Sequence, residues 1–152
     1  MSWQVVPGGV SESLSGISGS AADDVWIVGA SGRVLRWNGS ALVQVASHTT
    51  IDFSEVSGAA ANEVWAVGGG VARWNGTSWA RDATLSGSYS SVAASGRGGA
   101  WVVGASGAAQ RWNGATCTPV PALTSYALNA MWAVSLVDVR AVGMSSTVLR
   151  GH

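Results

Sequence analysis

The stretch Val64–Trp79, VWAVGGGVARWNGTSW, decides the fold. It contains an apolar run, a glycine turn, a second apolar run, an Asn-Gly turn and a closing Trp. Runs of about four to six residues rich in Val and Trp, bounded by Gly and Asn, are typical of short β-strands. Asn-Gly between two such runs predicts a hairpin, with a type I′ turn in which both central residues have positive φ.

This unit recurs four times along the chain. The first apolar run recurs at intervals near 40 residues, at Val25–Gly29, Val64–Gly68, Trp101–Gly104 and Val139–Gly143. The RWNG motif recurs at Arg36–Gly39, Arg73–Gly76 and Arg111–Gly114, and the fourth unit reaches Arg150 at the same place. Four antiparallel strands per unit with this period are the sequence signature of a β-propeller blade.

We therefore predict an all-β chain with a single β-propeller unit over residues 1–152. Its four-stranded antiparallel blades are expected at about 14–46, 53–83, 89–121 and 127–152. The fourth unit has no fourth strand of its own, and Met1–Val6 is similar to the segment that begins at Thr77-Ser78-Trp79. We expect strand 1–6 to complete the last blade, because this kind of closure protects an open sheet edge.

The segment Asp23–Gly39, DDVWIVGASGRVLRWNG, resembles the Trp-rich propeller repeats found in many bacterial proteins. These repeats are distant relatives of the Asp-box (sialidase-type) and photosystem-assembly-factor-like propellers. The resemblance covers nearly the whole chain and implies the fold, without a particular activity. The sequence departs from the Asp-box motif, because Trp37, Trp74 and Trp112 stand where that motif places Asp.

Two ring sizes agree with this repeat number. Four blades close a ring within one chain, or two chains contribute four blades each to an eight-bladed ring. The bulky layers of two Trp per blade favour the larger ring slightly, since its blades meet at a shallower angle. We expect a homodimer in preference to a four-bladed monomer.

The composition argues against several classes of partner. The chain is 47% hydrophobic and 11% charged, with a formal net charge of zero, so no electrostatic footprint for nucleic acid or an anionic membrane is present. Its start has neither the basic residues nor the apolar core of a signal peptide, and no apolar run has the length of a membrane helix. The sequence predicts a soluble protein and leaves its compartment open.

The sequence offers no catalytic constellation. His48 and His152 are the two histidines and Cys117 is the single cysteine, so a zinc site or a Cys/His nucleophile lacks its components. The glycine-rich segments alternate with strands and open no helix, which indicates turns and not phosphate loops. We predict a chain that is not an enzyme and that has no metal and no cofactor.

Recurring Trp residues are the candidates for ligand contact. Trp26, Trp65 and Trp101 lie within apolar strands and are expected in the core between blades. Those before the Asn-Gly turn, Trp37, Trp74 and Trp112, are expected nearer the ring surface. There a partly exposed indole stacks on a sugar ring, as in lectin-like propellers with one site per blade.

Recurring Arg residues accompany them. Arg36, Arg73, Arg111 and Arg150 each follow an apolar run, and acids lie two residues before the anchor position at Asp24, Glu63 and Asp138. These Arg residues form structural ion pairs or bond to carbonyls between blades, or they are polar contacts for a ligand, with Arg36, Arg73 and Arg111 as the candidates. In the fourth unit Trp132 and Arg140 differ from their counterparts, and we expect Trp132 to fill volume that Arg140 vacates.

Two functions remain open from the sequence. The first is a non-enzymatic binding module with a carbohydrate or peptide ligand on the ring face or between blades. The second is a propeller fragment, or an engineered or reconstructed scaffold, whose main property is self-assembly into a complete ring.

Overall fold

The computed structural model describes residues 2–96 and 98–151, and Met1, Arg97 and His152 lie outside the described residues. Its strands are β1 (Leu14–Ala21), β2 (Asp24–Gly29), β3 (Val34–Trp37) and β4 (Leu42–Gln44); β5 (Phe53–Ala60), β6 (Glu63–Gly68), β7 (Val71–Trp74) and β8 (Trp79–Arg81); β9 (Tyr89–Gly96), β10 (Gly99–Gly104), β11 (Ala109–Asn113) and β12 (Cys117–Val120); and β13 (Leu128–Ser135), β14 (Asp138–Gly143) and β15 (Val148–Gly151). Two short 3-10 turns, η1 (Ala30–Gly32) and η2 (Ala105–Gly107), join the second and third strands of the first and third units.

Each unit forms one antiparallel sheet in which neighbours in sequence pair in order. We call the sheets β1–β4, β5–β8, β9–β12 and β13–β15 blades 1 to 4. The first three have four strands, and the fourth has three within the described residues. The all-β prediction and the four repeated sheets are confirmed, and no helix among the described residues is long and apolar enough to cross a membrane.

The Asn-Gly turns form, but in another geometry than predicted. Gly76 has φ of +99°, whereas Asn75 is not among the residues with positive φ, so the type I′ expectation is wrong. The Asn75 side chain instead accepts hydrogen bonds from the backbone N–H of Thr77 and Ser78 at 2.9 and 3.0 Å. An Asx turn of this kind satisfies the local backbone donors and needs left-handed φ only at the Gly.

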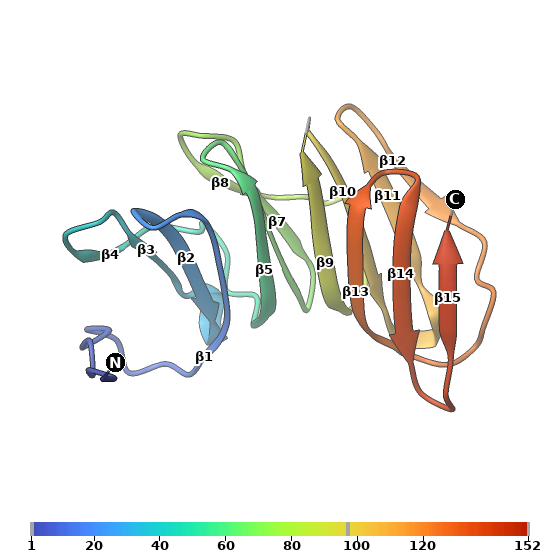
Figure 1. Ribbon diagram of the computed structural model, residues 1–152, viewed down its shortest axis with the longest axis horizontal. Helices are drawn as coiled ribbons and strands as arrows, with labels where there is room; N and C mark the ends of the chain where they lie inside the picture. The colour runs from blue at the N-terminus through green and yellow to red at the C-terminus, as the bar shows by residue number, and fades with distance from the viewer. Residues whose placement is uncertain (1, 97, 152) are drawn as a thin grey trace.

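The four blades pack face to face in a row, as Figure 1 shows from blue to red. The long first strand of each blade lies against that of the next, since β1 contacts β5, β5 contacts β9 and β9 contacts β13. A separate apolar cluster fills each junction, with Trp26 and Phe53 in the first, Trp65 and Tyr89 in the second, and Val103 and Leu128 in the third. The core of this protein is thus divided among its blade junctions.

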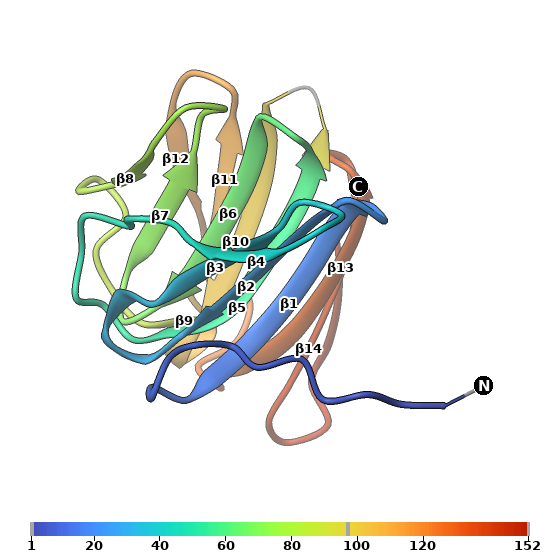
Figure 2. The same cartoon turned by 90° about the vertical axis from the view of Figure 1, so that its left-hand side faces the viewer.

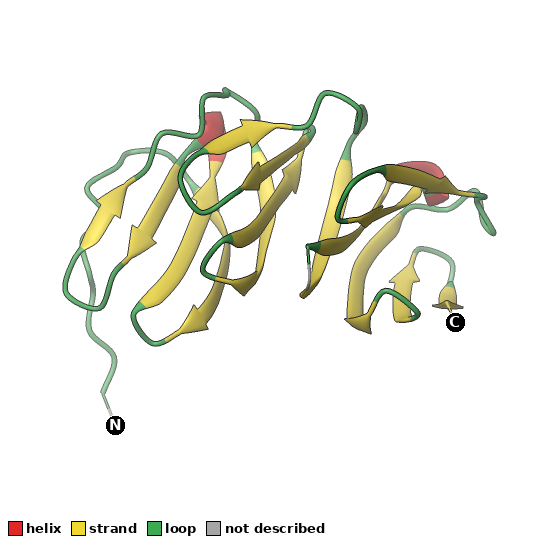
Figure 3. Ribbon diagram, turned by 90° about the horizontal axis from the view of Figure 1, so that it is seen from above, coloured by secondary structure: helices red, strands yellow, loops and turns green. Residues whose placement is uncertain are grey.

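The row of blades is an open arc and not a closed ring. Blade 1 and the N-terminus lie at one end of the arc, and blade 4 and the C-terminus lie at the other, as the view from above makes clear (Figure 3). Residues 2–6 form no strand, and β15 is the last strand of its sheet. The expectation that strand 1–6 completes blade 4 is therefore wrong within a single chain.

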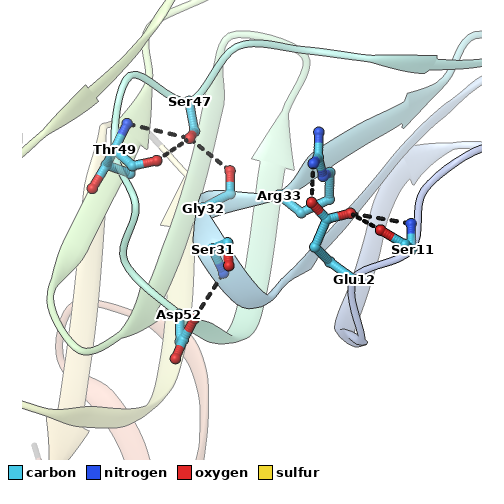
Figure 4. A network of polar contacts seen from close by, with 8 residues as sticks. All are labelled: Ser11, Glu12, Ser31, Gly32, Arg33, Ser47, Thr49 and Asp52. Atoms are coloured by element: carbon cyan, nitrogen blue, oxygen red, sulfur yellow. Dashed lines mark hydrogen bonds and ion pairs between the residues drawn. The ribbon is translucent and has the colours of Figure 1, made fainter.

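The N-terminal segment contacts blade 1 just before β1 begins. Glu12 and Arg33 form an ion pair, and Glu12 also accepts a hydrogen bond from the backbone N–H of Ser11 (Figure 4). The ion pair and these hydrogen bonds hold the pKa of the Glu12 carboxyl below its ordinary value. Figure 2 shows the N-terminal end of the chain extending away from the sheets, whereas Gly8, nearer to this ion pair, still lies beside Leu14 and Leu35 of blade 1.

Candidate binding surfaces at the ends of the arc

Two of the three Trp residues before the Asn-Gly turns, Trp74 and Trp112, pack on a Trp of the preceding blade. Trp74 is only 7% exposed, and its ring centroid lies 4.9 Å from that of Trp26 in blade 1. Its Nε1–H donates to the backbone O of Ala61 at 3.1 Å. The expectation of a partly exposed indole is wrong for Trp74, because strand β7 turns this face into the blade junction. Trp37 and Trp112 are half-buried.

The second junction joins two of the predicted residues in a cation–π stack. The Arg73 guanidinium lies 5.3 Å from the ring centroid of Trp65 and 5.4 Å from that of Trp112. The two rings lie 5.7 Å apart. A guanidinium over an indole face stabilises this arrangement electrostatically. Arg73 and Trp112 thus meet as packing partners across blades 2 and 3.

Among the described residues, the predicted ion pair between the acid and the Arg of one unit forms in blade 1 and does not form in blade 2. Arg36 pairs with Asp24 at 2.8 Å, which confirms the structural ion pair in blade 1. In blade 2, Glu63 accepts a hydrogen bond from the backbone N–H of Gly98 at 2.8 Å, a contact to blade 3 that the sequence pattern did not indicate. Arg111 faces an open surface hollow beside Trp101. In blade 4, Asp138 pairs with Arg140.

A partly buried chain of hydrogen bonds includes the one cysteine. The Cys117 thiol donates to Gln110 Oε1 at 3.1 Å, and Gln110 Nε2 donates to the Tyr89 hydroxyl at 2.6 Å. Burial raises the pKa of both the Cys117 thiol and the Tyr89 hydroxyl above their ordinary values. A raised pKa lowers the share of thiolate, which is the nucleophilic form of cysteine.

One apolar surface lies at the blade 1 end of the arc. We call Leu14 and Ile17 on β1 the leading end surface; they are 43% and 69% exposed. The register of the repeats makes Val56 and Val92 the counterparts of Ile17, and each of them is 4% exposed. These counterparts are buried because a preceding blade covers them.

A second apolar surface lies at the blade 4 end. We call Trp132, Val142 and Val148 the trailing end surface, and they are 58%, 45% and 71% exposed. The counterparts of Val142 and Val148 in blade 1, Val28 and Val34, are 0% and 1% exposed because blade 2 covers them. Trp132 stands directly opposite Arg140 in the β13–β14 pair, so the two exchanged residues do meet, but the indole stays exposed.

A narrow apolar groove lies beside the trailing end surface, between blades 3 and 4. Its volume is about 90 Å³, and its lining is almost entirely apolar. Residues from both blades and from the loop between them contribute: Trp101, Val120, Leu123, Leu128, Leu149 and Gly151. No motif in the sequence predicts this groove.

A metal site does not emerge from residues 2–96 and 98–151, where no three His, Cys, Asp or Glu side chains gather. The predicted contacts Trp37, Trp74 and Trp112 belong to three separate blades, so they do not form one site. The two end surfaces, the groove between blades 3 and 4, and an open groove along the starts of β5 and β9 are the candidate binding surfaces of the described residues.

Comparison with known proteins supports the fold. No protein-family model matches the chain, and no curated protein matches it. Among solved structures, YCF48 from Cyanidioschyzon merolae is similar with a TM-score of 0.70 and 17% identity, over 92% of this chain and 51% of that one. A structure of YCF48 bound to D1 peptide is similar with a TM-score of 0.64 and 21% identity, over 88% of this chain and 47% of that one.

These likenesses show the propeller-like fold and no more, since the identity is low. The chain spans about half the length of the structures that it matches. The resemblance to the Trp-rich bacterial repeats stays a prediction.

Proposed function

We propose that the chain is a non-enzymatic half-ring whose end surfaces bind those of a second copy, so that two chains close an eight-bladed β-propeller. The observation that carries the proposal is the exposure of Ile17, 69% against 4% for Val56 and Val92 at the same register. Exposed apolar patches of this kind mark interaction surfaces. At Val56 and Val92, the equivalent positions of blades 2 and 3, the preceding blade of the same chain covers the side chain.

A second copy fits because the apolar side chains of the two end surfaces are equivalent to the two sides of an interior junction. At the interior junctions the side chains equivalent to Val142 and Val148 receive the side chains equivalent to Leu14 and Ile17. A two-fold axis places blade 4 of one copy against blade 1 of the other, twice per ring. Such a pairing closes and leaves no further free end.

The junction between copies is expected to be more apolar than the interior ones. At the first two junctions a serine on the first strand of one blade accepts a hydrogen bond from a backbone N–H of the next blade. Ser18 Oγ accepts from Gly58 and Ser57 Oγ accepts from Ala94, both at 3.1 Å. Trp132 takes this position in blade 4. Its indole replaces a hydrogen bond by apolar contact area, which suits a junction that forms by association.

The proposal predicts a melting temperature that depends on protein concentration. Association stabilises the folded chain by mass action, so the Tm of a two-chain ring rises as the concentration is raised over a roughly 100-fold range. Differential scanning fluorimetry or calorimetry measures this. A Tm that stays constant over that range contradicts assembly.

A second candidate function is peptide binding. An open groove of about 500 Å³ runs along the starts of β5 and β9. Its lining includes Asp52, Ser54, Ser88 and Tyr89. Asp52, Ser54 and Ser88 are exposed along this groove and present polar atoms to an extended peptide, although Ser54 and Asp52 also bond within the chain. One similar structure is bound to the D1 peptide.

Isothermal titration with the D1 peptide tests this second candidate. Saturable binding that is lost when the exposed Ser88 is replaced by Arg supports it, and the absence of binding contradicts it. A carbohydrate ligand stays a prediction of the sequence, without Trp74 as a stacking platform.

A further inference from the structure

We propose that the groove between blades 3 and 4 is an indole site, filled by Trp3 from the N-terminal segment of a second copy. The inference rests on the proposed closure of the ring by two chains. It adds a specific site, a specific ligand side chain and a strand register to that closure.

The groove exists because blade 4 lacks the side chains that close the other junctions. At the first junction, Trp74 on β7 and Trp79 on β8 both pack against Trp26. At the third junction Gly151 takes the place of Trp74, and β15 is the last strand of the sheet within residues 98–151. The ring of Trp101, the counterpart of Trp26, is therefore half-buried and lines the groove.

Trp79 shows what occupies this position when the fourth strand is present. Its ring lies 5.4 Å from that of Trp26 in an edge-to-face arrangement, and it is only 2% exposed. Leu42 in blade 1 and Cys117 in blade 3 hold the same register position opposite the third strand. Each blade whose fourth strand is described thus has Leu, Trp or Cys at this position of the fourth strand.

Trp3 is the residue that corresponds to Trp79 at this position. Ser2-Trp3 repeats Ser78-Trp79 of blade 2, and Trp3 is 99% exposed. Val5, two residues further on, is 94% exposed. A segment of this composition with its apolar side chains in water gains free energy by pairing with an open sheet edge.

The β7–β8 pair supplies the register. There Trp74 pairs with Trp79, Arg73 with Ala80 and Ala72 with Arg81. The same register on β15 places Trp3 opposite Gly151, Gln4 opposite Arg150 and Val5 opposite Leu149. Gly151 leaves room beside its backbone for the large indole across from it.

The connection to blade 1 has the required length. Residues 45–52 link the fourth strand of blade 1 to the first strand of blade 2, and residues 6–13 form an equally long link to β1. The Glu12–Arg33 ion pair fixes the end of this link to blade 1. The docked strand therefore sits where a preceding blade would place its own fourth strand.

The occupant comes from a second copy because of the shape of the arc. The N-terminus lies at the blade 1 end and β15 at the blade 4 end, at opposite ends of the arc (Figures 1 and 3). In the two-chain ring these ends are neighbours across each junction. Each copy thus gives one Trp3 and receives one.

A cysteine cross-link tests the site in the full chain. Cys117→Ser removes the one native thiol, and Gln4→Cys with Arg150→Cys then places one cysteine on each side of the proposed strand pair. Opposed Cα atoms in an antiparallel pair lie about 4.5–5.5 Å apart, within the range that a disulfide spans. Val6→Cys with Arg150→Cys, two residues out of register, is the matched control.

We expect oxidised glutathione to convert the Gln4→Cys, Arg150→Cys chain into a covalent dimer on a non-reducing gel, with little dimer from the control pair. A cross-link within one chain overturns the assignment to a second copy. A light-scattering dimer that does not cross-link overturns the strand register while ring assembly stands. A chain that stays monomeric overturns the inference together with the proposed function.

Trp3 itself is tested without cysteines. Trp3→Ala is expected to raise the dimer dissociation constant by about 10³-fold, because a central Trp is lost at each of the two junctions. Trp3→Phe is expected to raise it by about 10-fold or less, since it keeps an aromatic ring. Trp3→Ala with an unchanged dissociation constant overturns the indole site. The melting profile at concentrations where both are dimers verifies that each variant is folded.

Discussion

Replacing Ile17 with Asp is expected to convert the two-chain ring into single chains at micromolar concentration. Ile17 is 69% exposed in the single chain and would be covered in both equivalent junctions of the ring. Losing its apolar burial costs roughly 2 kcal/mol per junction, and the buried carboxylate adds a desolvation penalty. Over two junctions, the dissociation constant is expected to rise by about 10³-fold or more.

Sedimentation velocity over a concentration series measures this change. Val43→Asp is the matched control, because Val43 is 41% exposed on the outer strand β4, away from the leading end surface. The control is expected to associate like the unaltered chain. An Ile17→Asp variant that associates as tightly as the control would show that the leading end surface is not an interface.

Replacing Trp74 with Ala is expected to lower the free energy of unfolding by about 3–5 kcal/mol. The side chain is 7% exposed, packs on Trp26 and Trp79, and donates its N–H to the backbone O of Ala61. Removing it opens a cavity in the first junction and leaves that carbonyl without this donor. A loss of any ligand binding in this variant would therefore report a damaged junction.

Urea denaturation followed by circular dichroism measures the effect. Tyr126→Ala serves as control, because this aromatic side chain is 50% exposed in the loop before β13, and its removal is expected to cost about 1 kcal/mol or less. Equal stability of the Trp74→Ala variant and the unaltered chain would contradict the placement of Trp74 in the junction.

The repeat pattern was sufficient to predict the blades. Alternating apolar residues and regularly spaced turns specify which segments pair and in what order, because these are local properties of the chain. The same pattern placed Trp26 and Trp65 in the core correctly. It does not indicate which neighbouring blade a buried face meets, and for that reason it predicts an exposed position for Trp74.

The end surfaces could not be recognised from sequence for a related reason. Ile17 and Val56 occupy equivalent positions and have similar side chains, yet one is exposed and the other is buried. The difference lies in the number of blades beside them, which no local pattern encodes. The Glu63 contact to Gly98 was likewise missed, since a carboxylate that accepts a backbone N–H from the next blade has no fixed sequence spacing.

The molar mass in solution tests the ring of two chains most directly. One chain has a mass of 15.4 kDa. Multi-angle light scattering on the unaltered chain at micromolar concentration is expected to give a single species of twice this mass, because the two-fold arrangement uses both end surfaces of each copy. A mass of 15.4 kDa at every concentration, or a series of ever larger species, would contradict the closed two-chain ring.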